Sequence, residues 1–515
     1  MKQIRLFSLA AIFLFLVAAC SNENILEPIP ASPAGVVFNE PELAMLYQMR
    51  GETRRVDLSQ ATRFAYDVIG FLDAEVATRS GNPRTIRSVA AMTFGKDKPT
   101  STRTSEGKLF EFPDTLAYVF NYDDNEGYAI VAADKRINAP ILAYCGGGSF
   151  SEENLKSNNP AMYCELQDVK AYAIECIARY EKKLKGVTTS VLQKLGLDNM
   201  SIDTRNGSND NYYLYIVPPP PDWPNGTPTY STNVPGNGIW NITEQVEPLL
   251  PVEWHQRFPF NNSVFNKDGS TNAPAGCTPV MLAQLMAYWQ YPLYADGVYL
   301  NWNLLRNYTA RPNAYPNVAN KQSLPSSVDV NNVDFVGMVS ALLEWIGENV
   351  GTSYSDKGSG TFYGYELPFL EDMGYNVGSG FRTYNYDVVI NSLINQRPVI
   401  ATGDAILNHE DGSHVWLIDG YIERQKTTPI LVEVRRVSDD SIVCIYQIPE
   451  TIVVNASYLH HNWGEEGNPL DTTPGGNAYI VAGSFFSENS DSLPSATRFS
   501  MNFLYNKQIC PNIYH

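Results

Sequence analysis

Cys277 is the residue whose surroundings point most directly to chemistry. It stands in the segment 275–279 (Ala-Gly-Cys-Thr-Pro), just before a strongly apolar stretch with helical spacing. A cysteine at a helix N-terminus faces the positive end of the helix dipole and unpaired N–H groups, which lower the pKa of its thiol. A buried structural cysteine is the competing interpretation, because such cysteines are common. The position alone therefore leaves both a thiolate nucleophile and a core residue open.

A thiolate nucleophile needs a general base, usually a histidine. Of the six histidines, His414 precedes an apolar, strand-like run that ends in Asp419-Gly420, so its ring could point into a cleft. A partly buried histidine in a sheet is the alternative interpretation. Farther along, residues 460–464 contain Asn462, an amide that could orient the imidazole, and Trp463, a ring that could cover that contact. The order Cys, His, Asn is typical of papain-like thiol proteases.

Gln256 is a candidate oxyanion donor. A thiol protease needs hydrogen-bond donors for the negative oxygen that develops during attack on a carbonyl. Gln256 lies in the segment 254–261, 21 residues before Cys277. An exposed loop amide is the alternative interpretation of the same residue.

A metal site is a third chemical possibility near His414. His409-Glu410 and His414 superficially resemble a metal-binding cluster. However, the spacing is not His-Glu-x-x-His, and Asp411-Gly412 would break the helix that such a motif needs. We therefore expect no metal and no cofactor.

The elements around these residues predict a C-terminal α+β domain at 241–515. Apolar residues at helical spacing predict helices at 278–290 and 333–349. Past residue 380 the pattern is mostly strands. The predicted strands are 398–401, 415–418, 430–434, 441–446 and 478–481. Helices followed by an antiparallel sheet indicate the α+β class.

A second α+β domain is predicted at 40–205. Its helices are expected within 40–75 and at about 160–185, and its strands at 117–122, 128–133 and 140–144. Residues 206–240, with four consecutive prolines at 218–221, have the composition of a linker.

The composition excludes several classes of protein. With 515 residues and 44% hydrophobic residues, the chain can bury a large core, and a net charge of −18 disfavours nucleic-acid binding. Seven cysteines are too few for a disulfide scaffold. Cys164 and Cys176 are twelve residues apart on one predicted helix, so they cannot pair, and we expect core positions for both. The pairing of Cys145, Cys444 and Cys510 stays open.

The N-terminus predicts export. Lys2 and Arg5 precede an apolar run at 6–17, which is typical of a signal peptide covering 1–19. The segment Val-Ala-Ala-Cys at 17–20 resembles a bacterial lipobox, in which Cys20 would be lipidated. We expect residues 20–39 to be a tether, and the protein to be a lipoprotein of the outer membrane, facing the periplasm or the cell surface, unless processing releases it.

Taken together, these segments resemble the streptopain family of cysteine proteases. The resemblance rests on five motifs in order and on a prodomain-like strand. They are Gln-x-x-Pro-aromatic-Asn at 256–261, Gly-Cys at 276–277, Tyr-Pro at 291–292, His414 with Asp419-Gly420, and His-x-Asn-Trp-Gly at 460–464, with the strand at 127–136. The similarity spans about 40–190 and 245–490. It implies a papain-like protease domain, in which the helix bearing the cysteine packs on an antiparallel sheet, preceded by an inhibitory prodomain.

The resemblance also implies roles for individual residues. Cys277 would be the nucleophile and His414 the general base and acid. Asn462 would orient His414, Trp463 would shield that contact, and Gln256 would complete the oxyanion hole. Ser359, Gly360 and Ser413 would line the substrate side. The implied partners are protein or peptide substrates and the chain's own prodomain, removed by cleavage near 200–235, in a monomer.

Some positions depart from the family pattern. Glu465 stands where the family has a second tryptophan, Ser413 replaces a glycine, and Thr278-Pro279 replaces Val-Ala. The segment 425–450 resembles an insertion. These departures leave open a second interpretation, a protease homologue of impaired activity that acts as a binding or inhibitor protein.

Overall fold

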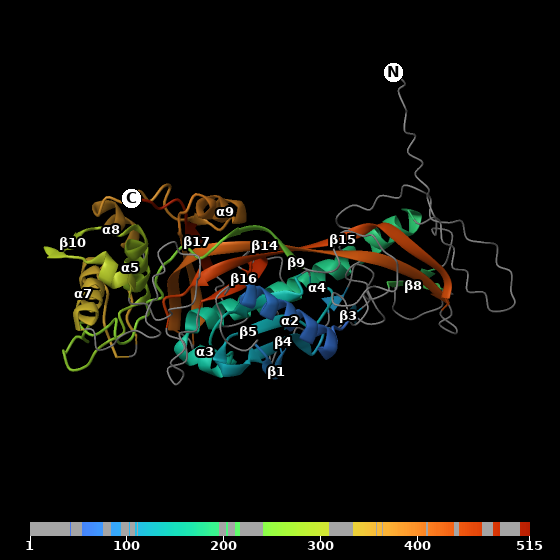
Figure 1. Ribbon diagram of the computed structural model, residues 1–515, viewed down its shortest axis with the longest axis horizontal. Coiled ribbons are helices and arrows are strands. Elements are labelled where there is room, and N and C mark those ends of the chain that lie inside the picture. The colour runs from blue at the N-terminus through green and yellow to red at the C-terminus, as the bar shows by residue number, and fades with distance from the viewer. Residues whose placement is uncertain are drawn as a thin grey trace, which may run out of the picture.

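The fold combines a helical layer with one large antiparallel sheet, which confirms the predicted α+β class (Figure 1). A computed structural model describes residues 42, 54–75, 84–93, 102–103, 109–110, 112–137, 139–194, 202–203, 212–216, 240–307, 333–356, 358–362, 364–407, 410–436, 442–465, 477–484 and 505–515. Within these ranges, no helix has the length and apolar character needed to cross a membrane. The predicted signal peptide and Cys20 lie outside the described residues.

The N-terminal domain is a four-stranded antiparallel sheet with helices packed against it. Its main elements are α2 (Leu58–Glu75), β1 (Ile86–Thr93), β4 (Thr115–Tyr122), β5 (Tyr128–Ala132), β6 (Ile141–Cys145), α3 (Glu152–Asn158) and α4 (Pro160–Lys194). Shorter elements are β2 (Thr102–Arg103), β3 (Leu109–Phe110) and the 3-10 turn η2 (Asp123–Asn125). The predicted hairpin is confirmed as β4 and β5, while α4 continues past the expected end near 185.

The sheet continues without a break from this domain into the C-terminal one. Its strand order is β1-β4-β5-β6-β16-β15-β14-β13-β17-β12. The C-terminal strands are β12 (Arg382–Thr383), β13 (Val399–Leu407), β14 (Glu410–Arg436), β15 (Ile442–Asn462), β16 (Ala478–Val481) and β17 (Tyr505–Cys510), with a 3-10 turn η3 (Ala482–Ser484) after β16. The two domains meet where β6 pairs with β16, in the register Tyr144 to Tyr479 and Ala143 to Ile480.

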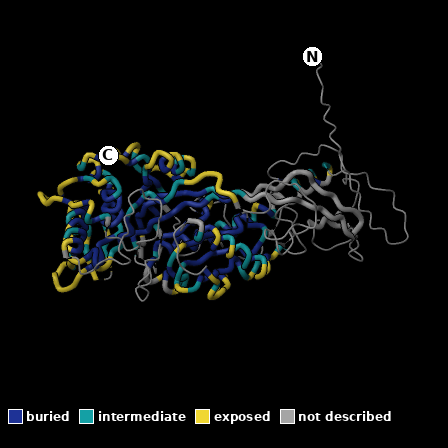
Figure 2. The backbone as a smooth tube through the Cα atoms, in the orientation of Figure 1, coloured by how far each residue is buried: buried dark blue, intermediate teal, exposed yellow. Residues whose placement is uncertain are grey.

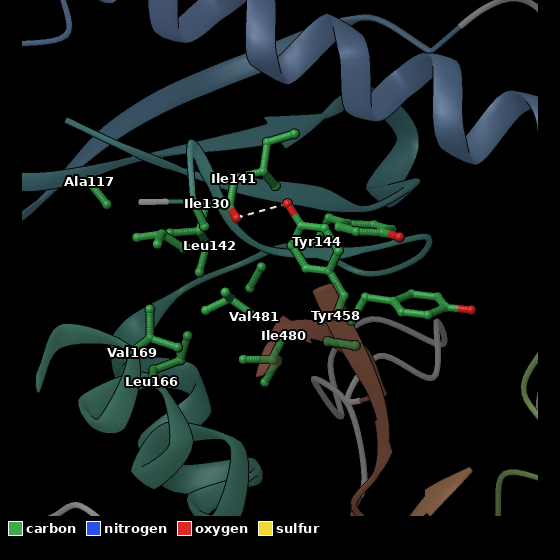
Figure 3. Close-up of a cluster of buried hydrophobic side chains, with 14 of the residues drawn as sticks. Ala117, Ile130, Ile141, Leu142, Tyr144, Leu166, Val169, Tyr458, Ile480 and Val481 are labelled. Atoms are coloured by element: carbon green, nitrogen blue, oxygen red, sulfur yellow. Dashed lines mark hydrogen bonds between the residues drawn. The ribbon is translucent and has the colours of Figure 1, made fainter. Parts of the chain in front are cut away.

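Aliphatic side chains and the rings of Tyr144 and Tyr458 form the core at this junction (Figure 3). The rings of Tyr144 and Tyr479 stack with centroids 5.0 Å apart, and the Tyr458 hydroxyl donates to the carbonyl of Ile141 at 3.1 Å. On α4, the Asp168 carboxylate lies 2.9 Å from the Lys507 ammonium of β17, and both side chains are buried. Backbone pairing, ring stacking and a buried ion pair therefore join the two domains.

The hairpin formed by β14 and β15 extends far beyond the rest of the sheet (Figure 1). The predicted strands 415–418 and 430–434 are parts of one strand, β14. Along its length, β14 pairs in turn with β13, with β9 (Trp240–Val246) and with β8 (Tyr212–Ile216). Strand β8 also pairs with β7 (Ile202–Asp203). The range 206–240 therefore contains a paired strand, β8, where the composition indicated only a linker.

A helical layer packs on one end of the sheet and carries a separate core. Its helices are α5 (Cys277–Trp289), α6 (Trp302–Asn307), α7 (Val333–Asn349) and α8 (Glu366–Asp372), with a small hairpin of β10 (Tyr294–Ala295) and β11 (Val298–Tyr299). Residues 278–287 of α5 are all buried (Figure 2). The same core includes Ile400, Val415 and Leu417 from the sheet, so α5 is pressed against β13 and β14 beside His414. Helix α9 (Tyr386–Ile394) instead packs Val389 and Leu393 into the core of the main sheet.

Candidate active site

Cys277 is the first residue of α5, as the sequence predicts. The preceding Gly276 has φ 94°, and a Cβ there would meet the side chains of Pro279 at 3.3 Å and Thr352 at 3.4 Å, so glycine is required by both backbone and space. Burial raises the pKa of the Cys277 thiol, and hydrogen bonds from the backbone N–H groups of Val415 and Thr278 oppose that rise. The prediction that the helix N-terminus lowers the pKa of Cys277 is therefore wrong, because desolvation outweighs the hydrogen-bond donors.

The backbone of His414 comes close to Cys277, since the N–H of the next residue, Val415, reaches the thiol. The Nε2 atom of His414 is 2.9 Å from the backbone carbonyl of Trp463. Since a carbonyl can only accept, Nε2 carries the proton and Nδ1 keeps its lone pair in the neutral ring. Burial lowers the pKa of His414 and outweighs the opposing effects of Glu465 and Trp463, which favours the neutral form.

Asn462 does not make the contact with His414 that we expected. Its buried amide instead donates to the Val252 carbonyl at 3.3 Å and to Gln284 Oε1 at 3.2 Å. Its Oδ1 accepts from Gln284 Nε2 at 3.1 Å and from the Gly464 N–H at 3.3 Å. The amide is saturated by these four hydrogen bonds to three residues, so the bond that orients His414 is made to the carbonyl of the following residue, Trp463.

Trp463 also differs from its expected role. Its buried ring stacks on His461, with centroids 5.0 Å apart, and packs against Trp416 at 4.9 Å. The ring that stacks on His414 is that of Trp416, with the ring centroids 5.9 Å apart. Trp463 thus positions His414 through its backbone, while Trp416 supplies the aromatic cover.

Gln256 reaches the site from the loop before α5. Its backbone carbonyl accepts from the N–H of Ala275, which fixes it close to the nucleophile segment. Its side-chain Nε2 donates to Glu465 Oε1 at 2.6 Å. The structure therefore brings the proposed oxyanion donor to the same end of the fold as Cys277 and His414.

Glu465 faces both Gln256 and His414, and its side chain is only 13% exposed. The oxygen that accepts from Gln256 lies 3.9 Å from His414 Nδ1. Burial raises the pKa of Glu465 to about 7, and Cys277 adds to the rise, whereas His414, Arg257 and Gln256 lower it. A carboxyl group that titrates near neutral pH thus stands between the oxyanion donor and the base.

Two residues at the site, Gln284 and Glu465, have functions that the sequence did not reveal. Gln284 accepts from the Trp254 N–H at 3.0 Å and exchanges hydrogen bonds with Asn462, so it ties the Gln256 loop to the end of β15. A buried amide within an otherwise apolar helix is the available signal for Gln284. For Glu465, the signal is its departure from the family's tryptophan.

Of the predicted substrate-side residues, Ser359 packs next to Gly276, the residue before the nucleophile. Ser359 Cβ lies 3.7 Å from where a Cβ of Gly276 would stand, and its buried hydroxyl has no hydrogen-bond partner among the described residues. Gly360 pairs with Ser353 through two backbone hydrogen bonds of 2.9 and 3.1 Å. Ser413 is exposed on β14, opposite Asp404. Their roles toward substrate remain predictions.

The other predicted features concern metals and cysteines. The described residues contain no group of three His, Cys, Asp or Glu side chains that could hold a metal ion, and His409 lies outside them. Cys164 and Cys176 are buried thiols that form no disulfide, which confirms their core positions. Cys145 and Cys510 are thiols outside any disulfide as well, while the side chain of Cys444 lies outside the described set.

Comparison with known proteins agrees with this arrangement. Residues 254–469 match the peptidase C10 family, and residues 82–170 match the Spi protease inhibitor family. The thiol protease/hemagglutinin PrtT of Porphyromonas gingivalis is 22% identical over 370 residues, which cover 68% of this chain and 36% of that protein. The chain thus spans about a third of the length of this curated relative.

Two solved structures of Prevotella intermedia interpain A are also similar. A prointerpain A fragment with a cysteine-to-alanine substitution is 16% identical and covers 72% of this chain and 97% of its own, with a TM-score of 0.33. The active wild-type interpain A cysteine protease is 17% identical and covers 47% of this chain and 96% of its own, with a TM-score of 0.27.

Residues 254–469 are thus similar to the peptidase C10 family, the streptopain family that the motifs resemble, and an inhibitor-like segment at 82–170 precedes them.

Proposed function

We propose that the protein is a thiol endopeptidase that cleaves peptide bonds through a covalent acyl-enzyme. The observation that carries the proposal is the orientation of His414. The Trp463 carbonyl holds its Nε2–H at 2.9 Å, so Nδ1 is the basic atom on the ring that lies beside Cys277. Holding the tautomer of the base in this way is what a thiol nucleophile requires.

The chemistry follows from these positions. The Cys277 thiol gives its proton to His414 Nδ1, and the thiolate attacks the carbonyl carbon of the scissile bond. The negative oxygen is stabilised by Gln256 Nε2 and the Cys277 N–H. His414 then protonates the leaving amine as the C–N bond breaks. A water molecule, deprotonated by His414, attacks the acyl-enzyme, and the thiol leaves with the returned proton.

Zymogen control is proposed to act by cleavage between the two domains. The inhibitor-like match at 82–170 supports residues 40–205 as an intramolecular inhibitor, and the range 206–240 is the connection that would be cut. Lipidation at Cys20 would anchor the protein at the outer membrane. Proteins or peptides are the proposed substrates.

An inactive homologue that serves as a binding or inhibitor protein is the second candidate. One observation favours it. The side-chain amide of Gln256 already donates to Glu465, and a substrate carbonyl would need the same amide as its donor. The two candidates differ in whether Cys277 carries out chemistry.

The deciding experiment incubates the purified chain 20–515 as the wild type and as Cys277→Ala, followed by mass measurement and peptide hydrolysis. We expect self-cleavage within or close to 206–240 in the wild type alone, together with labelling of Cys277 by iodoacetamide. Identical masses and no hydrolysis in both proteins would favour the binding protein. Hydrolysis that survives Cys277→Ala but stops with a chelator would exclude the thiol mechanism.

A further inference from the structure

We propose that the Glu465 carboxylate is an internal competitor for the oxyanion site, because it competes with the substrate carbonyl for the side-chain amide of Gln256. This inference rests on the function proposed above and assigns an inhibitory contact to a residue outside the Cys-His pair. It predicts that the Glu465 side chain lowers the catalytic activity of the enzyme.

The geometry carries the inference. A single oxygen of Glu465 accepts from Gln256 Nε2 at 2.6 Å and lies 3.9 Å from His414 Nδ1. The oxygen of a scissile carbonyl has to meet the same Gln256 donor, because an oxyanion donor acts at hydrogen-bond distance. Gln256 Nε2 has two N–H groups, and Glu465 holds one of them. The substrate oxygen must therefore either take this donor from Glu465 or share the amide with a carboxylate that repels its developing negative charge.

The backbone turn explains why residue 465 points back into the site. Gly464 has φ 65°, a left-handed conformation, and its N–H is held by Asn462 Oδ1 at 3.3 Å. A Cβ at Gly464 would lie 2.9 Å from the Val280 side chain on α5. The turn is therefore fixed against the nucleophile helix, and the side chain that follows it is directed toward Gln256.

The chemistry of the side chain matters as much as its position. Tryptophan, which the family pattern has here, offers only a donor and could not accept from Gln256. Glutamate offers an acceptor, and when charged it also repels an oxyanion. The charged or titratable groups that face it are His414, Cys277 and Arg257, with the neutral amide of Gln256. His414 and Arg257 favour the anion, while burial and Cys277 disfavour it.

The test compares Glu465→Ala and Glu465→Gln with the wild type, all as the full chain after its own maturation. The matched control is Glu371→Gln on α8, an exposed carboxylate in a different helix. Three quantities are measured: kcat/KM for a peptide amide, the inhibition constant of a peptide aldehyde, and the limiting rate of Cys277 alkylation by iodoacetamide at alkaline pH. The aldehyde forms a tetrahedral adduct whose oxygen needs the oxyanion site, whereas alkylation does not.

We expect Glu465→Ala to raise kcat/KM by about tenfold or more and to tighten aldehyde binding by a similar factor, because a charged hydrogen bond no longer has to be broken. Glu465→Gln keeps an acceptor but loses the charge, so its gains should be smaller and should grow as pH rises through neutrality. The limiting alkylation rate and the Glu371→Gln control should not change. A thermal melt of each variant checks folding, and Glu465→Gln preserves the side-chain shape if alanine disturbs the turn.

The inference is overturned if both Glu465 variants hydrolyse peptide and bind aldehyde as the wild type does, or less well, while Cys277→Ala is inactive. That result leaves the proposed function standing. If no protein in the series hydrolyses peptide and Cys277 is not alkylated, the proposed function fails and this inference fails with it.

Discussion

Two histidine–carboxylate pairs lie close together in the same sheet, and they are built in opposite ways. In the first, His460 Nδ1 is 2.6 Å from Asp419 Oδ1, and both side chains are at most 2% exposed. The other Asp419 oxygen accepts from the Leu250 N–H at 3.1 Å, and its backbone carbonyl accepts from Leu249. Every oxygen of Asp419 thus has a partner, which ties β14 both to His460 of β15 and to the segment following β9.

The second pair, His414 and Glu465, is open. Its facing atoms are 3.9 Å apart, which is beyond hydrogen-bond distance, and the carboxylate is bonded to Gln256 instead. Burial shifts both pKa values toward the neutral forms, down for His414 and up for Glu465. The closed pair of His460 and Asp419 holds two segments together. In the open pair, His414 Nδ1 and the Glu465 carboxyl oxygen are not bonded to each other, so each can interact with another group.

The largest expected effect separates the two histidines by activity. His414→Ala should lower kcat by at least about 10³-fold, because it removes the general base and acid. Its free energy of unfolding, measured by urea titration, should fall less than that of His460→Ala. A His414→Ala protein that keeps a tenth of the wild-type rate would contradict the assignment.

His460→Ala should show the reverse pattern. It leaves the Asp419 carboxylate buried without its partner and should lower the free energy of unfolding by about 4 kcal/mol. The rate per folded molecule should change little. His460→Asn is the matched control, since its amide can still donate toward Asp419 and should lose less stability. Equal losses in the two variants would show that packing, and not the pair, is what matters.

The smallest effect concerns pH and the open pair. The pKa of Glu465 is about 7 in the folded protein against a reference value of 4.5, so the folded state binds more protons than the unfolded state between these values. Stability should therefore fall as pH rises through this range, by about 3 kcal/mol or less. Urea unfolding at pH 5 and pH 8 should show that Glu465→Gln lacks this loss. Parallel pH profiles for the two proteins would contradict it.

The sequence allowed us to predict which residues lie at the site, but not which hydrogen bonds they form there. Cys277, Gln256 and His414 converge as expected, because helix start, motif order and strand pattern are local signals. Neither Asn462 nor Trp463 makes the expected contact with His414 through its side chain, and the partners of the buried Asn462 amide depend on Gln284, 178 residues away in the chain. Such a contact exists only after α5 has packed on the sheet.

The fold shows the same division. The hairpin of β4 and β5 and the helix α7 were predictable from periodicity alone. The continuous β14 was not, because its middle section lacks a strand-like apolar pattern and is held by backbone pairing with β9. Strand β8 lies in a segment whose composition indicates a linker, and its partner is more than 200 residues later in the chain. Pairing over such distances leaves no local trace in the sequence.

The sheet that runs through both domains has a consequence for what a cut can achieve. While the chain is intact, the prodomain is held beside the protease at an effective concentration set by the connecting segment. A break in that segment removes the tether but none of the pairing between β6 and β16, nor the contact between Asp168 and Lys507. Separation then becomes a bimolecular equilibrium, so dilution, and not the cut alone, would determine when the two halves part.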